Sequence, residues 1–218
     1  MTTLPLTGVF VTGTDTDVGK TVVAAWLTRN WHADYWKPVQ SGIVDGSDAA
    51  CIAALAPGTP IHPSAYTLQA PLSPHEAARR ENRRIDLAAI ALPATAAPLV
   101  VEGAGGVLVP LSDTALMVDL IARVGLPALV VARSTLGTIN HTLLTLEALA
   151  RRGLPALGVV LVGPPSPANR QAIEQFGGVA VLAELPPLPA VDAAAIAFLP
   201  PPSFPPPPSF PTPVRRLP

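Results

Sequence analysis

A glycine-bounded loop between an apolar run and a helical pattern constrains the fold more than any other feature of this sequence. Residues 11–21 read VTGTDTDVGKT, with Gly13 at one end and Gly19, Lys20 and Thr21 at the other. The usual phosphate-binding loop (P-loop) has four residues between its glycines, whereas this chain has five, residues 14–18. A loop that follows a strand and opens a helix presents backbone N–H groups to a phosphate. The sequence therefore predicts an α/β fold that binds a phosphorylated ligand.

Short apolar runs and helical patterns alternate along the chain. The apolar runs cover 8–12, 33–39, 99–102, 128–131, 157–162 and 179–182. The helical patterns cover 20–30, 48–56, 75–80, 87–92, 115–124, 139–152 and 168–176. Strands that are apolar on both faces are typical of a parallel sheet with helices on each side. We therefore expect a single-domain, P-loop NTPase-like α/β fold with a mostly parallel, doubly wound sheet.

Length and composition limit the domain count and the partners. The chain has 218 residues, which we divide into one domain over 1–198 and a proline-rich tail over 199–218. Its formal net charge is −1 and only 13% of its residues are charged, so we expect neither nucleic acid nor a membrane surface as a partner. Cys51 is the single cysteine, which excludes an internal disulfide framework. With no signal peptide expected, we predict a cytoplasmic protein that binds small molecules.

The tail reads PPPSFPPPPSFPTPVRRLP from residue 200 to the end of the chain. Proline lacks the backbone N–H that helices and sheets require, so the tail is expected to be extended or disordered. It is either an extension without a function or a docking segment for an SH3-like partner.

The P-loop supplies the first candidate side chains. Lys20 offers a cation to phosphate, and the hydroxyl of Thr21 can reach Mg²⁺. Asp15 and Asp17 are unusual in such a loop, because a carboxylate beside phosphate is unfavourable. We expect them to face a cation or an amine instead.

Lys37 lies at the end of the next predicted strand, in the stretch YWKPVQSG, and Ser41 lies in the turn that follows. Ligands of open α/β sheets bind at the carboxyl ends of strands, so Lys37 is a candidate second cation for a transferring phosphoryl group. Taken alone, a lysine in this position is a solvated surface group.

Two acidic residues complete a candidate magnesium site. Glu102 ends an apolar strand in VVEGAGG, as a Walker-B acid does, although on its own it would be interpreted as capping a turn. Asp48 precedes a helix and on its own would be interpreted as an N-cap. Together with Thr21, these carboxylates offer the hard oxygen ligands that Mg²⁺ prefers.

Gly137 and Thr138 lie where the predicted helix of 139–152 begins. Free amides at a helix N-terminus can bind a carboxylate. His141 lies in the first turn, and we interpret it as structural because no neighbour in the sequence reads as its partner.

In combination, these motifs resemble the dethiobiotin synthetase family over about residues 9–188. The resemblance rests on GTDTDVGKT, YWKPVQSG, the SD pair at 47–48, LSPH at 72–75, VEGAGG followed by PLSD, and LGTINHTLLT. It implies that the longer P-loop faces a diamine. The implied reaction forms a carbamate from 7,8-diaminononanoate and CO₂, phosphorylates it with MgATP, and closes a cyclic urea with loss of phosphate. Members are homodimers.

The resemblance also assigns roles to residues. Lys20 and Lys37 are the catalytic cations, and Thr21, Asp48 and Glu102 hold Mg²⁺. Substrate is bound by Thr16, Asp17, Lys37 and Ser41, with Gly137, Thr138 and Asn140 of the other chain on its carboxylate. The nucleotide is bound by Asp17, Val18, Gly19, Lys20, Thr21, Val22, Asp48, Glu102, Gly103, Ala104, Gly105, Val162, Gly163, Pro186, Pro187 and Leu188.

One position departs from the family pattern. Many members carry an asparagine that recognises adenine where this chain has Val162, followed by Gly163. A valine side chain cannot make that amide contact, so we predict that other nucleoside triphosphates compete with ATP.

A P-loop switch ATPase that positions protein partners is the alternative hypothesis. Such proteins usually carry a second lysine directly after the first loop glycine, and here that residue is Thr14.

Overall fold

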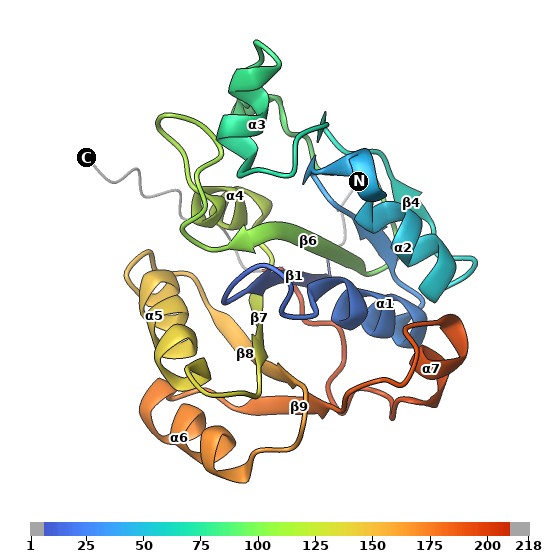
Figure 1. Cartoon of the computed structure of the whole chain (residues 1–218), viewed down its shortest axis with the longest axis vertical. Coiled ribbons are helices and arrows are strands. Elements are labelled where there is room, and N and C mark those ends of the chain that lie inside the picture. Colours follow the sequence, from blue (N-terminus) through green and yellow to red (C-terminus); the bar gives the residue numbers. More distant parts are fainter. Residues whose placement is uncertain (1–6, 210–218) are drawn as a thin grey trace.

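A seven-stranded sheet forms the centre of the structure, a computed structural model that describes residues 7–209 (Figure 1). Its strand order is β4-β2-β6-β1-β7-β8-β9, and each neighbouring pair is parallel. The strands are β1 (Gly8–Gly13), β2 (Asp34–Trp36), β4 (Ile61–His62), β6 (Leu99–Gly106), β7 (Ala128–Arg133), β8 (Ala156–Val162) and β9 (Val181–Leu185). The predicted parallel α/β fold is confirmed.

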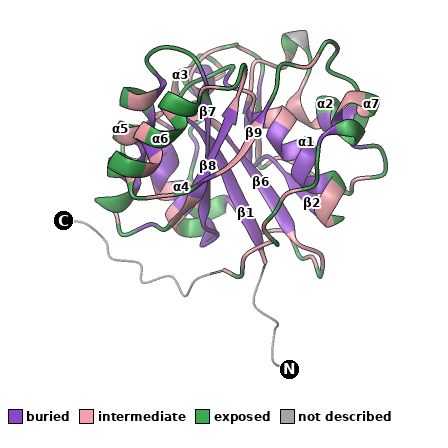
Figure 2. Cartoon of the chain, turned by 90° about the horizontal axis from the view of Figure 1, so that it is seen from below, coloured by how far each residue is buried: buried purple, intermediate pink, exposed green. Residues whose placement is uncertain are grey.

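Helices cover both faces of this sheet, and the strands are buried between them (Figure 2). On one face lie α1 (Lys20–Trp31), α2 (Asp48–Leu55) and α7 (Ala193–Phe198). On the other lie α4 (Met117–Val124), α5 (Thr138–Ala150) and α6 (Pro167–Gly177). Successive side chains of β1 point to opposite faces of the sheet: Phe10 packs in the core under α4, α5 and α6, whereas Val9 and Val11 pack in the core under α1, α2 and α7. This arrangement explains why the strands read as continuous apolar runs.

A small second sheet lies beside the main one. It pairs β3 (Val39–Ser41) with β5 (Tyr66–Leu68) in parallel, and α3 (Pro74–Arg80) packs against it. The strand predicted over 33–39 is therefore wrong in its second half, because it ends at Trp36 and a new strand begins at Val39. Pro38 between them has no N–H for a sheet.

Five other elements differ from the predicted pattern. The helix expected over 87–92 is only the 3₁₀ turn η2 (Leu87–Ala89), which buries none of its residues. A second 3₁₀ turn, η1 (Ile43–Asp45), was not predicted. Neither were β4 and β5, whose two or three residues are too few for a periodic pattern, nor the alanine-rich helix α7.

Residues 200–208 of the predicted tail lie against the domain. Their contacts reach α1 and the start of β1, while residues 210–218 lie outside the described part of the chain. No helix within residues 7–209 is long and apolar enough to cross a membrane.

Candidate functional site

The predicted site residues gather at the carboxyl edge of the sheet, where β1 leads into the P-loop and its neighbour β6 carries Glu102. A cavity of about 920 Å³ opens there. It is lined by Thr16, Asp17, Gly19, Lys20, Thr21, Val22, Lys37, Gln40, Ser41, Gly42, Asp48, Pro71, Leu72, Ser73, Pro74, Glu102, Ala104, Gly105 and Val109. Segments from the P-loop, β3, α2 and the 71–74 loop thus meet at one hollow. Ligands of open α/β sheets bind in this kind of crevice.

The P-loop folds tightly on itself. The ammonium of Lys20 donates to the carbonyl oxygen of Asp15 at 2.8 Å. A Cβ at Gly13 would lie 2.6 Å from that same oxygen, so a side chain has no room there. Gly19 has φ 96° and its Cα faces Val162, whose Cγ1 would lie 3.0 Å from a Cβ at that position. Both ends of the loop therefore require glycine.

Lys37 lies between two carboxylates. Its Nζ donates to Glu102 Oε1 at 3.0 Å and forms an ion pair with Asp48 Oδ2. The Thr21 hydroxyl lies 2.9 Å from Asp48 Oδ1 and 3.0 Å from Glu102 Oε1. The structure therefore brings together residues that are up to 81 positions apart in sequence. We call Thr21, Lys37, Asp48 and Glu102 the central cluster.

The central cluster is largely buried. Lys37 is 5% exposed and Glu102 only 1%. Burial by itself would lower the pKa of Lys37, but the charges of Glu102 and Asp48 outweigh it and raise that pKa. For Asp48, burial opposes ionisation, and the Lys37 ammonium outweighs it and lowers the pKa. Lys37 thus stays charged and Asp48 stays ionised at neutral pH.

Lys20 is in a different electrostatic position. Its side chain is 8% exposed, and among the described residues it forms no ion pair with an acid. Burial lowers its pKa, with the charge of Glu102 acting in the opposite direction. A phosphate beside Lys20 would supply the negative charge that this ammonium lacks.

Tyr35 and Gln40 support the central cluster and were missed by sequence reasoning. The fully buried Tyr35 donates from its hydroxyl to Glu102 Oε2 at 2.9 Å. Burial, followed by the charge of Glu102, raises the pKa of Tyr35 well above its usual value. Gln40 Oε1 accepts from the backbone N–H of Asp48 at 3.1 Å. Tyr35 lies in the stretch YWKPVQSG, two residues before Lys37. Side chains two residues apart on a strand point to the same face, and this spacing was the one signal in the sequence that linked Tyr35 to Lys37.

Arg133, at the carboxyl end of β7, is a third residue that the sequence did not reveal. Its Nη2 donates to Asp15 Oδ2 at 2.9 Å, while Asp15 Oδ1 accepts from the backbone N–H of Thr16 at 2.8 Å. The Thr16 bond, with Arg133 adding to it, holds the pKa of Asp15 below its usual value. The expectation that an acid in this loop faces a cation is confirmed for Asp15.

The structure decides three single-residue alternatives. Lys37 is buried and not a solvated surface group. The N-cap of α2 is Ser47, whose hydroxyl accepts from the N–H of Ala50 at 3.1 Å, so the N-cap interpretation of Asp48 is wrong. Glu102 contacts Lys37, Thr21 and Tyr35 and does not cap a turn.

Some predicted binding residues lie away from the central cavity. Val18 is buried in the core, so only its backbone faces the loop. The amide of Gly163 donates to Leu185 O at 2.9 Å, and the carbonyl of Val162 accepts from Ser134 at 3.0 Å. Pro186 and Pro187 follow β9 and offer no N–H, and the side chain of Leu188 packs against the core on the α1 side of the sheet.

Gly137, Thr138 and Asn140 do not line the central cavity of the same chain. Gly137 caps α5, and the buried Thr138 hydroxyl lies 3.4 Å from that of Thr142. The exposed His141 lines a separate cavity of about 280 Å³, together with Asp15, Leu108 and Leu144.

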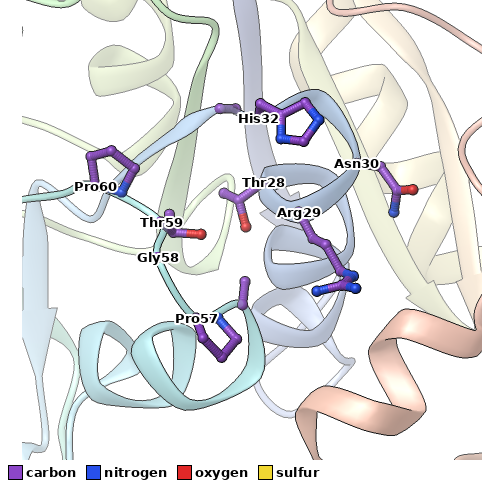
Figure 3. A pocket seen from close by; sticks show the side chains of 10 residues that line it. Thr28, Arg29, Asn30, His32, Pro57, Gly58, Thr59 and Pro60 are labelled. Carbon is purple, nitrogen blue, oxygen red and sulfur yellow. The ribbon is translucent and has the colours of Figure 1, made fainter.

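A further cavity of about 480 Å³ lies at the other end of α1 (Figure 3). Thr28 and Arg29 line it from α1, His32 lines it from the position directly after that helix, and residues 56–60 line it from the loop after α2. The C-termini of α1 and α2 both lie there, and the partial negative charge of their free carbonyl groups is unfavourable for binding phosphate. None of the predicted site residues contributes to this cavity.

The oxygen atoms of the central cluster are suited to Mg²⁺. A hydroxyl within 3.0 Å of two carboxylates matches the hard oxygen ligands of that ion. No group of three or more His, Cys, Asp or Glu side chains within residues 7–209 would hold a metal by itself. Water and a nucleotide phosphate would complete the octahedral coordination of Mg²⁺.

A phosphate-binding loop, buried cations and a parallel sheet define the class of the chain: it is a P-loop nucleotide-binding protein. Over residues 7–195 the sequence matches the AAA domain family. It is 66% identical over 197 residues to the ATP-dependent dethiobiotin synthetase BioD of Paramagnetospirillum magneticum, which covers 90% of this chain and 96% of that protein. The Agrobacterium fabrum protein of the same name is 47% identical over 85% of this chain and 89% of its own length. The chain belongs to the ATP-dependent dethiobiotin synthetase family.

A solved structure gives the same fold. The ParA family ATPase of Chlorobium tepidum TLS superposes with a TM-score of 0.56 over 88% of this chain and 96% of that one, at 11% identity. This likeness concerns the fold alone. It does not favour the switch-ATPase alternative over the family to which the sequence belongs.

Proposed function

We propose that the central cavity carries out the ATP-dependent conversion of 7,8-diaminononanoate and CO₂ into dethiobiotin, with release of ADP and phosphate. As a member of its family, the chain is an enzyme of biotin biosynthesis that uses ATP. The observation that carries the mechanism is the buried ammonium of Lys37, held between Glu102 and Asp48 beside the P-loop.

The reaction has three bond-forming steps. One amine of the substrate adds to CO₂ and loses a proton, which gives a carbamate. A carbamate oxygen attacks the γ-phosphorus of ATP and ADP leaves. The second amine then attacks the carbonyl of the mixed anhydride, and phosphate leaves as the ring closes. The enzyme must hold two amines in position and stabilise a negatively charged phosphoryl group.

Lys20 and Lys37 are placed to stabilise that charge. Both ammonium groups line the central cavity, and both are nearly excluded from water, where an electrostatic interaction is stronger than in solution. Lys20 contacts the phosphates of the nucleotide, and Lys37 stabilises the group in transfer. Its two carboxylate partners hold the Lys37 ammonium in one orientation before substrate binds.

Thr16, Asp17 and Ser41 bind the diamine. All three line the same cavity as the two lysines. Asp17 is exposed, and its φ of 54° is unusual for a residue other than glycine. Such a backbone conformation is retained where it orients a functional side chain. The Asp17 carboxylate is therefore assigned to an amine or to the proton that an amine loses.

Thr21, Asp48 and Glu102 would hold Mg²⁺, which when bound neutralises charge on the β- and γ-phosphates. The backbones of residues 17–22 and 103–105 bind the phosphates and ribose. Residues 162–163 and 186–188 lie at the ends of β8 and β9 and contact the base.

The active form is proposed to be a cytoplasmic homodimer. Leu136, Leu108 and Leu144 expose 103%, 54% and 56% of their side chains around the start of α5. Apolar side chains grouped in this way favour burial against a second copy. The amides of Gly137, Thr138 and Asn140 would then reach the substrate carboxylate in the site of the other protomer.

The direct test is to incubate the purified protein with 7,8-diaminononanoate, bicarbonate, Mg²⁺ and ATP, and to detect dethiobiotin by mass spectrometry. We expect product and phosphate in equal amounts. Hydrolysis of ATP that needs a protein partner and forms no dethiobiotin would support the switch ATPase instead.

A further inference from the structure

The proline-rich segment of residues 200–208, here called the strap, lies on α1 through an alternating pattern of contact. Pro202, Phe204 and Pro206 are partly buried, whereas the residues between them are exposed. One side of an extended chain therefore faces the domain. The match to the AAA domain family ends at residue 195, so the strap lies beyond the part of the chain that defines the family.

Two tryptophans of α1 bind the strap. Trp26 donates from its indole N–H to Pro200 O at 2.8 Å, and Trp31 donates to Phe204 O at 3.2 Å. The ring of Phe204 packs edge-on against both indoles, with ring centroids 6.3 Å from Trp26 and 5.6 Å from Trp31. Trp26 is 1% exposed with the strap in place, and the carbonyl of Pro200 satisfies its buried indole N–H.

Both ends of the strap are fixed to the same chain. Leu199, directly before it, is 7% exposed in the core that contains α1. At the other end, the N–H of Gly8 donates to Pro207 O at 2.7 Å, and Thr7 pairs with Pro208. Because Leu199 is anchored, the local concentration of the strap at α1 is high.

Proteins that bind polyproline peptides usually do so with aromatic side chains. Here two aromatic rings and their indole N–H groups face a proline-rich backbone in the same way. The bound stretch also belongs to a sequence repeat, since Pro-Pro-Ser-Phe-Pro occurs at residues 201–205 and again at 207–211. The first copy is described, and Phe210 of the second lies outside the described residues.

We propose that Trp26 and Trp31 form a binding site for a Pro-Pro-Ser-Phe-Pro peptide, and that its ligand is the strap of the same chain. Phe204 is the anchor, and the two indole N–H groups select backbone carbonyls. The site lies on α1, the helix that begins with Lys20 and Thr21.

The test uses the full chain with Phe204→Ala and Phe210→Ala, so that neither repeat retains its aromatic anchor. The matched control is Phe176→Ala with Phe198→Ala, because those side chains are 68% and 90% exposed. Changes in tryptophan emission and in its quenching by acrylamide report on Trp26 and Trp31, because the third tryptophan, Trp36, is 2% exposed and lies in the other core. We expect a red shift and stronger quenching in the first variant and neither change in the control. Equal emission in the two variants would overturn the proposal.

Addition of a synthetic peptide with the sequence of residues 200–209 should reverse the change in the anchor-free variant. The same peptide with alanine in place of phenylalanine should have no effect, and the unmodified chain, whose site is occupied, should not respond. A failure of the peptide to restore the emission would refute the site. A change in the emission of the unmodified chain on dilution would mean that a second copy supplies the strap.

A second variant covers the case in which the first does not fold. Trp31→Phe keeps a ring but removes the N–H that donates to Phe204 O. Hydrogen exchange at the amide of Gly8, which is bonded to Pro207 O, then measures release of the strap. Faster exchange supports the proposal, and unchanged exchange contradicts it.

Discussion

Arg133 Nη2 lies 2.9 Å from Asp15 Oδ2 and joins the end of β7 to the middle of the P-loop. The two side chains are about half exposed, and an ion pair of this kind contributes little to stability. Its effect is on the loop, because Asp15 also accepts from the N–H of Thr16. The pair therefore orients Thr16, which we assign to the substrate.

The first prediction concerns this orientation. Arg133→Gln should leave the free energy of unfolding within about 0.5 kcal/mol of the unmodified value. It should raise the KM for the diamine by up to about fivefold, which corresponds to about 1 kcal/mol. Arg151→Gln is the control, since Arg151 pairs with Glu147 on the surface of α5. Identical KM values in the two variants would rule out a positioning role.

The second prediction concerns Tyr35. Tyr35→Phe removes the hydroxyl that donates to the buried Glu102, and one carboxylate oxygen then loses a partner. The expected loss of stability is about 1–3 kcal/mol in urea denaturation. The other tyrosine, Tyr66, forms exposed hydrogen bonds with Asp86, so Tyr66→Phe should cost less and leave turnover unchanged. An equal loss in both variants would argue against a special role for Tyr35.

The third prediction separates stability from catalysis at Lys37. Lys37→Ala should reduce turnover about 10²- to 10³-fold with nucleotide binding nearly intact. It should also destabilise the fold by about 3–5 kcal/mol, because Glu102 and Asp48 would face each other without a cation. Lys37→Met with Glu102→Gln should recover much of that stability and none of the turnover. Normal turnover in Lys37→Ala would exclude the lysine from the chemistry.

The sequence was sufficient to predict the parts of the site whose residues are close together in the chain. The P-loop, with its strand, glycines and helix, is contiguous in the chain, and so its fold and its position at a sheet edge were predictable. Lys37 and Glu102 were found because each stands at the end of an apolar run. Asp48 taken alone left two interpretations open, since a helix beginning at a serine and aspartate pair does not show which residue caps it, and only its combination with Thr21 and Glu102 indicated a site.

The remaining contacts depend on tertiary distance. Arg133 and Asp15 are separated by 118 positions, and nothing in either local sequence signals the pair. The same holds for Trp26 and Pro200, 174 positions apart. A run of prolines predicts an extended backbone, but not the surface on which it lies. Short strands such as β4 form only because they pair with a neighbouring strand, and their two or three residues are too few to show a periodic pattern in the sequence.

The fourth prediction concerns selectivity for the nucleotide. With Val162 in place of an amide side chain, and with the Gly163 amide already bonded to Leu185, few groups remain to select adenine. The preference for ATP over CTP and GTP in turnover should be below about 100-fold, or roughly 2.7 kcal/mol. Val162→Asn, which is similar in volume, should increase that preference. A larger preference in the unmodified chain would contradict the prediction.

The last prediction follows from the opposite pKa shifts of Lys37 and Asp48. The pKa of Asp48 is lowered in the folded chain, so its contribution to stability is present above the unfolded value of about 3.9 and is lost as the pH falls through the folded value. The pKa of Lys37 is raised, so its contribution is complete below about pH 10.4 and is lost as the pH rises through the folded value.

The measurement is the free energy of unfolding in urea from acid to alkaline pH, for the unmodified chain and for Lys37→Met with Asp48→Asn. The difference between the two should be constant from about pH 5 to 9 and should shrink at both ends. A difference that is constant over the whole range would show that the charges of this pair do not contribute to stability.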